Sequence, residues 1–175
     1  MHPFDPLTPV EISRAAEIVR PHFPQEPNFR VITLQEPPKQ QMIAYLDQEH
    51  SRKKDNKTKA PTRCARVEVV VKLLEEKNAL FELLVDLDND KVIAKQHHRG
   101  KHSYIDADYM QRVEAACLAD EGVQEQIRVL DLPPESSVVV EPWAYATDGE
   151  NDMSQRLSMV GDSRPKLKTH LQATF

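Results

Sequence analysis

The first hydrophobic pattern along the chain predicts an amphipathic helix close to the N-terminus. Thr8 stands at an N-cap position, Pro9 suits the first helical position, and Glu11 follows at the spacing of a capping box. The apolar residues after it recur at helical spacing and form one stripe: Ile12, Ala15, Ala16 and Val19. We therefore expect a short helix that packs one face on a core and is ended by Pro21 and Pro24.

The segments after this helix carry strand patterns. Apolar or β-branched residues concentrate in four short runs, at residues 29–34, 65–74, 80–87 and 91–96. A tight hairpin signal, Asp-Asn-Asp at 88–90, separates the last two runs. The stretch 40–46 fits a short helix or an edge strand equally well. A helix followed by an antiparallel meander predicts an α+β fold in which the helix covers one face of the sheet.

The same order then begins again with fewer elements. Asp106 can cap a helix whose shared face holds Tyr109, Val113, Ala116 and Cys117. Gly122 is expected to break this helix before a further helical turn at 123–129. Residues 136–140 predict a strand that leads into Glu-Pro-Trp at 141–143. The sequence thus predicts two small units of helix on antiparallel sheet, the second incomplete.

These patterns divide the chain into four parts. Residues 1–98 hold the complete unit, 99–103 form a polar linker, and 104–160 hold the incomplete unit. Residues 161–175 lose apolar periodicity, so we expect a disordered or aberrant tail there. Residues 51–62 are polar and rich in lysine, which predicts a solvated insertion or a local contact with an acidic partner.

Charge and hydropathy exclude several classes of partner. The 23 basic and 28 acidic residues give a net charge of −5, so the chain has no general attraction to nucleic acid. No apolar run reaches the length that spans a bilayer, and the N-terminus shows no secretory signal. We expect no nucleic-acid or membrane partner and an intracellular location, cytoplasmic or peroxisomal, although the Ala-Thr-Phe C-terminus is not a peroxisomal signal.

Three groups of residues could carry chemistry, and each has a simpler explanation. His97, His98 and His102 lie close together, but adjacent histidines on a strand point to opposite faces, and a solvated strand end is expected. Cys64 and Cys117 could form one bridge, although two free thiols are favoured in an intracellular chain. Cys117 lies on the apolar helix face, which favours inert packing over a nucleophile.

An acidic run resembles the start of a calcium loop. Asp86, Asp88 and Asp90 have the alternating spacing of such a loop, but the required glycine and the distal glutamate are missing. A plain turn is the expected structure. The sequence therefore predicts no catalytic residue, no metal ligand and no cofactor-binding residue.

One string of residues is more informative than any of these groups. Residues 2–12 read His-Pro-Phe-Asp-Pro-Leu-Thr-Pro-Val-Glu-Ile. This string resembles the opening of the second N-terminal (N2) domain of copper-containing primary amine oxidases, which typically begins His-Pro-Leu-Asp-Pro-Leu-Thr. Further likenesses follow: Leu-x-Glu-Pro-Pro-Lys at 34–39, the meander at 67–92, an acidic helix at 106–126 and Val-x-Pro-Trp at 140–143. The resemblance covers residues 1–158 and implies an N2-like domain at 1–98 and a partial third (N3-like) domain at 104–160.

The resemblance implies a reaction that this chain lacks the residues to perform. The family oxidises primary amines to aldehydes with release of ammonia and hydrogen peroxide, using copper and topaquinone in a downstream catalytic domain. The tyrosine that becomes topaquinone follows an asparagine, and two copper ligands form a His-x-His pair. This chain contains neither motif. We expect a fragment that binds no cofactor, is inactive alone, and in full-length relatives contacts the catalytic domain and a homodimer partner; the alternative is a stand-alone α+β interaction module.

Trp143 is the one residue with a candidate role at a substrate site. As the only tryptophan, it could be a core aromatic. The resemblance implies instead that it helps to line the channel through which amine reaches the quinone. An aromatic wall suits this passage because a ring face attracts a cation weakly.

Overall fold

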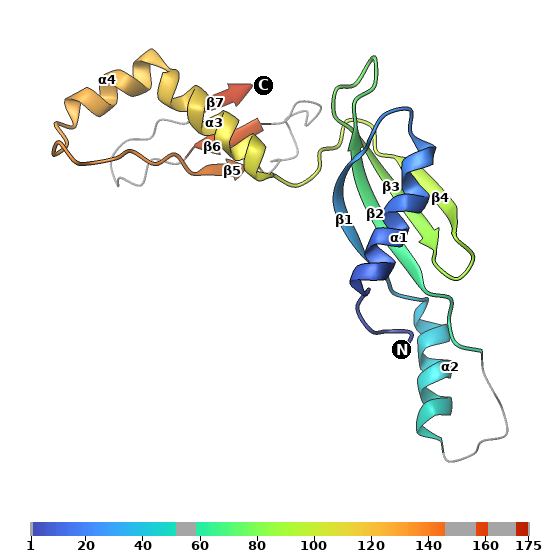
Figure 1. Ribbon diagram of the computed structural model, residues 1–175. Coiled ribbons are helices and arrows are strands. Elements are labelled where there is room, and N and C mark those ends of the chain that lie inside the picture. The colour runs from blue at the N-terminus through green and yellow to red at the C-terminus, as the bar shows by residue number, and fades with distance from the viewer. Residues whose placement is uncertain (1, 52–58, 146–156, 161–170, 175) are drawn as a thin grey trace. The chain divides into compact units, whose positions relative to one another are not determined.

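The computed structural model describes residues 2–51, 59–145, 157–160 and 171–174 (Figure 1). The chain forms two compact units, Met1–Ser103 and Tyr104–Phe175. Each unit combines helices with an antiparallel sheet, which confirms the predicted α+β class.

The first unit contains a four-stranded antiparallel sheet in the order β1-β2-β3-β4. In chain order, its elements are α1 (Pro9–Val19), the 3₁₀ turn η1 (Arg20–His22), β1 (Asn28–Gln35), α2 (Lys39–His50), β2 (Cys64–Val71), β3 (Ala79–Asp86) and β4 (Lys91–His97). All four strand segments predicted for this unit are therefore confirmed, with ends shifted by a few residues. The ambiguous stretch 40–46 belongs to a helix.

The core of the first unit lies between α1 and one face of the sheet (Figure 1). Strand β2 shows the reason most clearly, because every second residue is buried and those between are half-buried. The buried cluster comprises Ala15, Val19, Phe23, Ala65, Val67, Val69, Val71, Leu83, Val85 and Leu87. The apolar stripe predicted for the first helix thus faces the sheet through Ala15, Ala16 and Val19.

The N-terminal end of α1 has the capping box that its sequence predicts. Thr8 Oγ1 accepts a hydrogen bond from Glu11 N at 3.2 Å, and Thr8 N donates to Glu11 Oε2 at 2.8 Å. The α-helix ends at Val19, close to the predicted end at Pro21. The helical turn continues past it, however, as the 3₁₀ turn η1, which contains Pro21. A proline is tolerated there because the first positions of a helical segment need no N–H donor.

The acidic run between β3 and β4 forms a turn, as expected. Asp86 is buried, and its Oδ1 accepts hydrogen bonds from the backbone N–H groups of Asp88 and Asn89, both at 3.0 Å. Asn89 Nδ2 donates to the other carboxylate oxygen at 2.8 Å. Asp90 has a φ of +53° and forms an ion pair with Arg14 of α1. The carboxylates of Asp86 and Asp90 are thus occupied in holding the hairpin.

The second unit is built from two helices and short strands. It contains α3 (Ala107–Ala119), α4 (Glu121–Val129), β5 (Pro142–Ala144), β6 (Leu157–Val160) and β7 (Leu171–Thr174), with the strands in the antiparallel order β5-β6-β7. Asp106 caps α3 by accepting from Tyr109 N at 2.7 Å. Tyr109 and Val113 are the buried residues of α3, and Ser158 Oγ of β6 donates to Tyr109 OH at 3.0 Å. This contact ties the helix to the sheet.

Three predictions for the second unit differ from the structure. The strand expected at 136–140 is wrong: these residues are irregular, and the strand lies at Pro142–Ala144, where β6 supplies its partner. Gly122 does not break a helix but lies inside α4, because Asp120 already ends α3 and caps α4. The predicted tail includes strand β7 at Leu171–Thr174, while residues 161–170 lie outside the described part of the chain.

Candidate functional site

The proline-rich opening segment, residues 2–7, is gathered around the side chain of Arg63. This guanidinium donates to the carboxylate of Glu11, with Nε–Oε1 at 2.7 Å and Nη2–Oε2 at 3.1 Å. It also donates to backbone carbonyls of the opening segment, namely those of His2 at 3.1 Å, Pro3 at 3.0 Å, Asp5 at 3.1 Å and Pro6 at 3.4 Å. We call this arrangement the Arg63 clasp. The side chains of Arg63 and Glu11 are only 11% and 17% exposed.

The clasp follows from what a proline-rich segment lacks. Pro3 and Pro6 have no N–H group, so the segment cannot form a regular helix or strand and its carbonyls need donors from elsewhere. Arginine suits this task because its planar group carries five N–H donors. The hydrogen bond from Arg63 is the largest cause that lowers the pKa of Glu11 to about 2, with further help from the backbone N–H of Thr8. Glu11 therefore stays ionised at neutral pH.

A second set of contacts joins the opening segment to α2. His2 Nε2 lies 3.3 Å from Glu49 Oε2, and the rings of His2, Phe4 and Tyr45 pack edge to face at centroid distances of 5.0 to 5.9 Å. Helix α2 buries none of its residues, so these contacts matter for its position. The segment that carries the family resemblance therefore has a structural role: it joins α2 to the region around Arg63.

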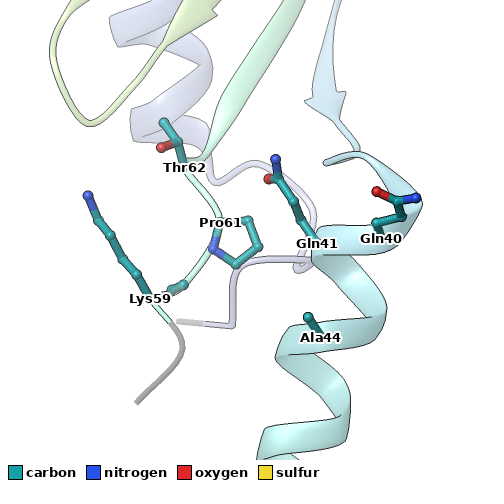
Figure 2. A pocket seen from close by; sticks show the side chains of 7 residues that line it. Gln40, Gln41, Ala44, Lys59, Pro61 and Thr62 are labelled. Carbon is teal, nitrogen blue, oxygen red and sulfur yellow. The ribbon is translucent and has the colours of Figure 1, made fainter. Parts of the chain in front are cut away.

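An open pocket of about 410 Å³ lies between α2 and the segment that leads into β2 (Figure 2). Its lining residues are mostly polar or small: Gln40, Gln41, Ala44, Lys59, Ala60, Pro61 and Thr62. Figure 2 shows the side chains of Gln41 and Pro61 on the two sides of this space. Among the described residues, the lining has no carboxylate, histidine or cysteine.

The structure does not assemble the three candidate histidines into a metal site. His97 Nε2 lies 2.9 Å from Glu76 Oε2, and its ring stacks on Phe81 at 4.4 Å. It is therefore a half-buried part of the fold, which differs from the expected solvated strand end. His98 donates its backbone N–H to Leu80 O, and His102 has a partner of its own. Within the described residues, no group of three His, Cys, Asp or Glu side chains could hold a metal ion.

Both cysteines are free thiols, as favoured from the sequence. Burial raises the pKa of the Cys64 thiol, with Asp86 and Asp88 adding to the effect. Burial likewise raises the pKa of the Cys117 thiol, helped by Asp120. A raised pKa lowers the fraction of reactive thiolate at neutral pH. Neither cysteine has the environment of a nucleophile.

Trp143 lies in the middle of β5, directly opposite Met159 of β6. Its side chain is 57% exposed, so the alternative of a core aromatic is wrong for this chain. Its neighbour Pro142 is buried, which shows that the two residues face opposite sides of the strand.

Two residues that organise the first unit were not identified from the sequence. Arg63 and Lys95 each bond to partners more than 50 positions away, so no local spacing reveals them. The run of prolines in the opening segment is the one available signal for Arg63, because such a run leaves carbonyls without local donors.

No helix in the described part of the chain is both long and apolar enough to cross a membrane.

Comparison with known proteins places this architecture in a family. The family model for the N2 domain of copper amine oxidase matches residues 2–98. Copper amine oxidase 1 of Schizosaccharomyces pombe is 29% identical over 161 residues, which cover 90% of this chain and 21% of that protein. Copper amine oxidase 1 of Aspergillus niger is 31% identical over 153 residues, which cover 82% of this chain and 22% of that protein.

A solved structure also matches most of this chain but only a small part of its own length. The copper-containing benzylamine oxidase from Hansenula polymorpha superimposes with a TM-score of 0.69 and 27% sequence identity, covering 91% of this chain and 24% of that one. The chain thus spans between a fifth and a quarter of the length of the relatives that it matches. Because the family model matches more than half of its residues, the chain belongs to the copper amine oxidase family, and residues 2–98 are its N2 domain.

Proposed function

We propose that this chain is an N-terminal, non-catalytic region of a copper amine oxidase-like protein and that it has no oxidase activity alone. The observation that carries this proposal is the N2-domain match at residues 2–98 in a chain spanning about a fifth of its relatives. The reaction of the whole protein is then the oxidation of primary amines to aldehydes, with release of ammonia and hydrogen peroxide. Copper and topaquinone supply that chemistry in the catalytic domain, and this chain holds neither the Asn-Tyr pair nor the His-x-His pair.

The N2 domain then contributes a folded unit whose opening segment is held by Arg63. The Arg63 clasp holds the opening segment against α1 and β2, and the second unit begins at Tyr104. In this proposal, residues 104–160 are a partial N3-like domain. The partners are the catalytic domain of the parent protein and its homodimer mate; the compartment, cytoplasmic or peroxisomal, stays a prediction.

Within the whole protein, we assign Trp143 to the wall of the amine channel. Its exposure on β5 supports this assignment, because a side chain that meets another domain is uncovered when that domain is absent. Pro142 restricts Glu141 to extended geometry and so helps to fix the strand end on which Trp143 stands.

An assay for hydrogen peroxide tests the main proposal. The purified 175-residue chain, supplied with copper(II), oxygen and a panel of primary amines, should release no peroxide above a blank without protein. No quinone absorbance should develop during incubation with copper. The full-length benzylamine oxidase from Hansenula polymorpha is the positive control. Amine-dependent peroxide from the chain would overturn the proposal.

Fluorescence and mutation test the role of Trp143. Emission should be red-shifted and readily quenched, because the indole contacts water. Trp143→Ala should change the free energy of unfolding by less than about 1 kcal/mol, well below the 3 kcal/mol or more expected for a buried tryptophan. Protected, blue-shifted emission with a large loss of stability would refute the channel assignment.

A further inference from the structure

Helix α2 lacks several features that keep a helix folded by itself. It has 12 residues, a length at which an isolated helix is only marginally stable. Its N-cap is Pro38, which makes no side-chain cap hydrogen bond. The charges are placed against the helix dipole, since Lys39 lies in the first turn while Asp47 and Glu49 outnumber His50 in the last. The stability of α2 therefore depends on its contacts with other segments.

The core of the first unit gives α2 little support. Helix α1 buries Ala15, Ala16 and Val19, whereas α2 buries none of its residues and extends beyond the end of the sheet in Figure 1. Residues 59–62 face α2 across the open pocket (Figure 2). Most helices in proteins are stabilised by packing an apolar face on a core. For α2, the described contacts of another segment take that part.

That segment is the opening segment, residues 2–7. Tyr45 and Glu49 lie one turn apart and share a face of α2. The rings of His2 and Phe4 lie edge to face with Tyr45, at centroid distances of 5.7 and 5.9 Å. His2 Nδ1 accepts from Phe4 N at 3.3 Å, which leaves the proton of Nε2 to donate to Glu49 Oε2 at 3.3 Å. The opening segment thus contacts one face of α2 through two rings and a hydrogen bond.

The opening segment is in turn attached to the sheet. Arg63 directly precedes β2, and its guanidinium binds the carbonyls of the segment in the Arg63 clasp. Pro3 and Pro6 restrict the backbone between these carbonyls. The clasp therefore fixes where the rings of His2 and Phe4 stand. A continuous set of contacts leads from β2 through Arg63 and the opening segment to α2.

We propose that the opening segment is a strap that keeps α2 folded. In this view, α2 is helical while the rings of His2 and Phe4 lie against Tyr45, and it unfolds as a unit when they leave it. The sheet stays folded in both states, because neither Phe4 nor Tyr45 belongs to the core cluster. Release of α2 also removes one wall of the open pocket, so the strap controls whether that pocket exists.

Hydrogen exchange in the full chain, followed in peptides that cover residues 39–50, tests the strap. Tyr45→Ala raises the intrinsic helix propensity of α2 but removes both ring contacts. A helix that is stable by itself would exchange more slowly in this variant, whereas a strapped helix exchanges faster. We expect exchange in α2 to become about tenfold faster, with no change in β2 and β3.

Two further variants separate the strap from the helix. Phe4→Ala alters no residue of α2, yet it should accelerate exchange there because Phe4 packs on Tyr45. Ile43→Ala is the matched control, since it replaces another large side chain of α2 that is 47% exposed. Alanine also favours the helix at this position, so exchange in α2 should not become faster.

Three results would overturn the strap. They are exchange of α2 in the parent chain at the rate of an unstructured peptide, exchange in Tyr45→Ala no faster than in the parent, and equal acceleration in Ile43→Ala. Acceleration of β2 together with α2 in Tyr45→Ala would also count against it, because α2 would then unfold only with the core. If Phe4→Ala loosens β2 as well, Tyr45→Ala decides, since Tyr45 lies outside the opening segment and the core cluster.

Discussion

At the scale of single residues, the family motif and the residue that holds it lie far apart in the chain. Arg63 lies more than 50 positions after the opening segment. Its guanidinium donates to the carbonyls of that segment, at His2, Pro3, Asp5 and Pro6. Local spacing predicted the bond between Thr8 and Glu11 because a capping box is a signal of four consecutive residues. It could not predict Arg63, because that pairing exists only after β2 has docked beside α1.

Removal of Arg63 should destabilise the first unit substantially. Arg63→Ala leaves the poorly exposed Glu11 carboxylate with only the hydrogen bonds from Thr8 and without a positive charge beside it. It also leaves carbonyls of the opening segment without this donor. We expect a loss of about 3 kcal/mol in the free energy of unfolding, measured by urea denaturation. Arg128→Ala is the control, because the Arg128–Glu125 pair is exposed and should contribute less than about 1 kcal/mol. Equal losses in the two variants would contradict a structural role for the clasp.

The clasp should also give the protein a defined sensitivity to acid. The pKa of Glu11 is about 2 in the folded chain against an ordinary 4.5, because Arg63 and Thr8 bind its ionised form. Its contribution is therefore complete above about pH 4.5 and is lost as the pH falls towards 2. We expect the difference in unfolding free energy between the parent and Glu11→Gln to shrink across this range. Asp86 and Asp90, whose pKa values are also lowered, act in both proteins. A difference that does not vary with pH would contradict the assignment.

At the scale of elements, prediction succeeded where the signal was local and periodic. The signal for α1 is a capping box, and the signal for β2 is an alternation of apolar and polar residues. Both signals lie within or next to the element itself, and the structure has both elements close to their predicted positions. Residues 136–140 show the limit, since a serine and valine run with high strand propensity remains irregular and Val139 is 77% exposed. A strand needs a partner as well as propensity, and β6 pairs with Pro142–Ala144 instead.

The cap of α1 offers a test at this scale. Thr8→Ala removes the hydroxyl that accepts from Glu11 N and donates to Glu11 Oε2 at 3.0 Å. We expect a loss of about 1 kcal/mol in the free energy of unfolding, as is usual for an N-cap. Thr8→Ser keeps the hydroxyl and should lose much less. Hydrogen exchange in the first turn of α1 should accelerate only in the alanine variant, and similar exchange in both variants would argue against the cap.

At the scale of the whole chain, the two units differ in how much core they contain. The first unit buries a contiguous cluster of ten apolar residues, contributed by α1, the sheet and the segments beside them. The described apolar residues of the second unit that are buried are Tyr109, Val113, Val140 and Pro142, while Trp143 and Met159 stay exposed. The sequence predicted a second unit with fewer elements than the first, through the shorter series of periodic segments at 104–160 and the loss of periodicity from about residue 159. It could not show that β5 pairs with residues 157–160, or that these pair in turn with 171–174, since both pairings are non-local.

The inequality predicts that the two units unfold separately. Trp143 is the only tryptophan, so its fluorescence reports on the second unit, while far-UV circular dichroism reports on both units, because each contains α-helices of similar length. In urea, we expect the fluorescence change to be small, because Trp143 is already 57% exposed, and to come early and be broad, because few buried apolar side chains support cooperativity. The dichroism should lose the part of its signal that comes from α3 and α4 in the same early phase and the remainder in a later, steep transition. A fragment of residues 1–103 should reproduce that steep transition at nearly the same urea concentration, because its core is complete without the second unit. Coincident fluorescence and dichroism curves in the full chain, together with a fragment that does not fold, would show instead that the two units form one cooperative body.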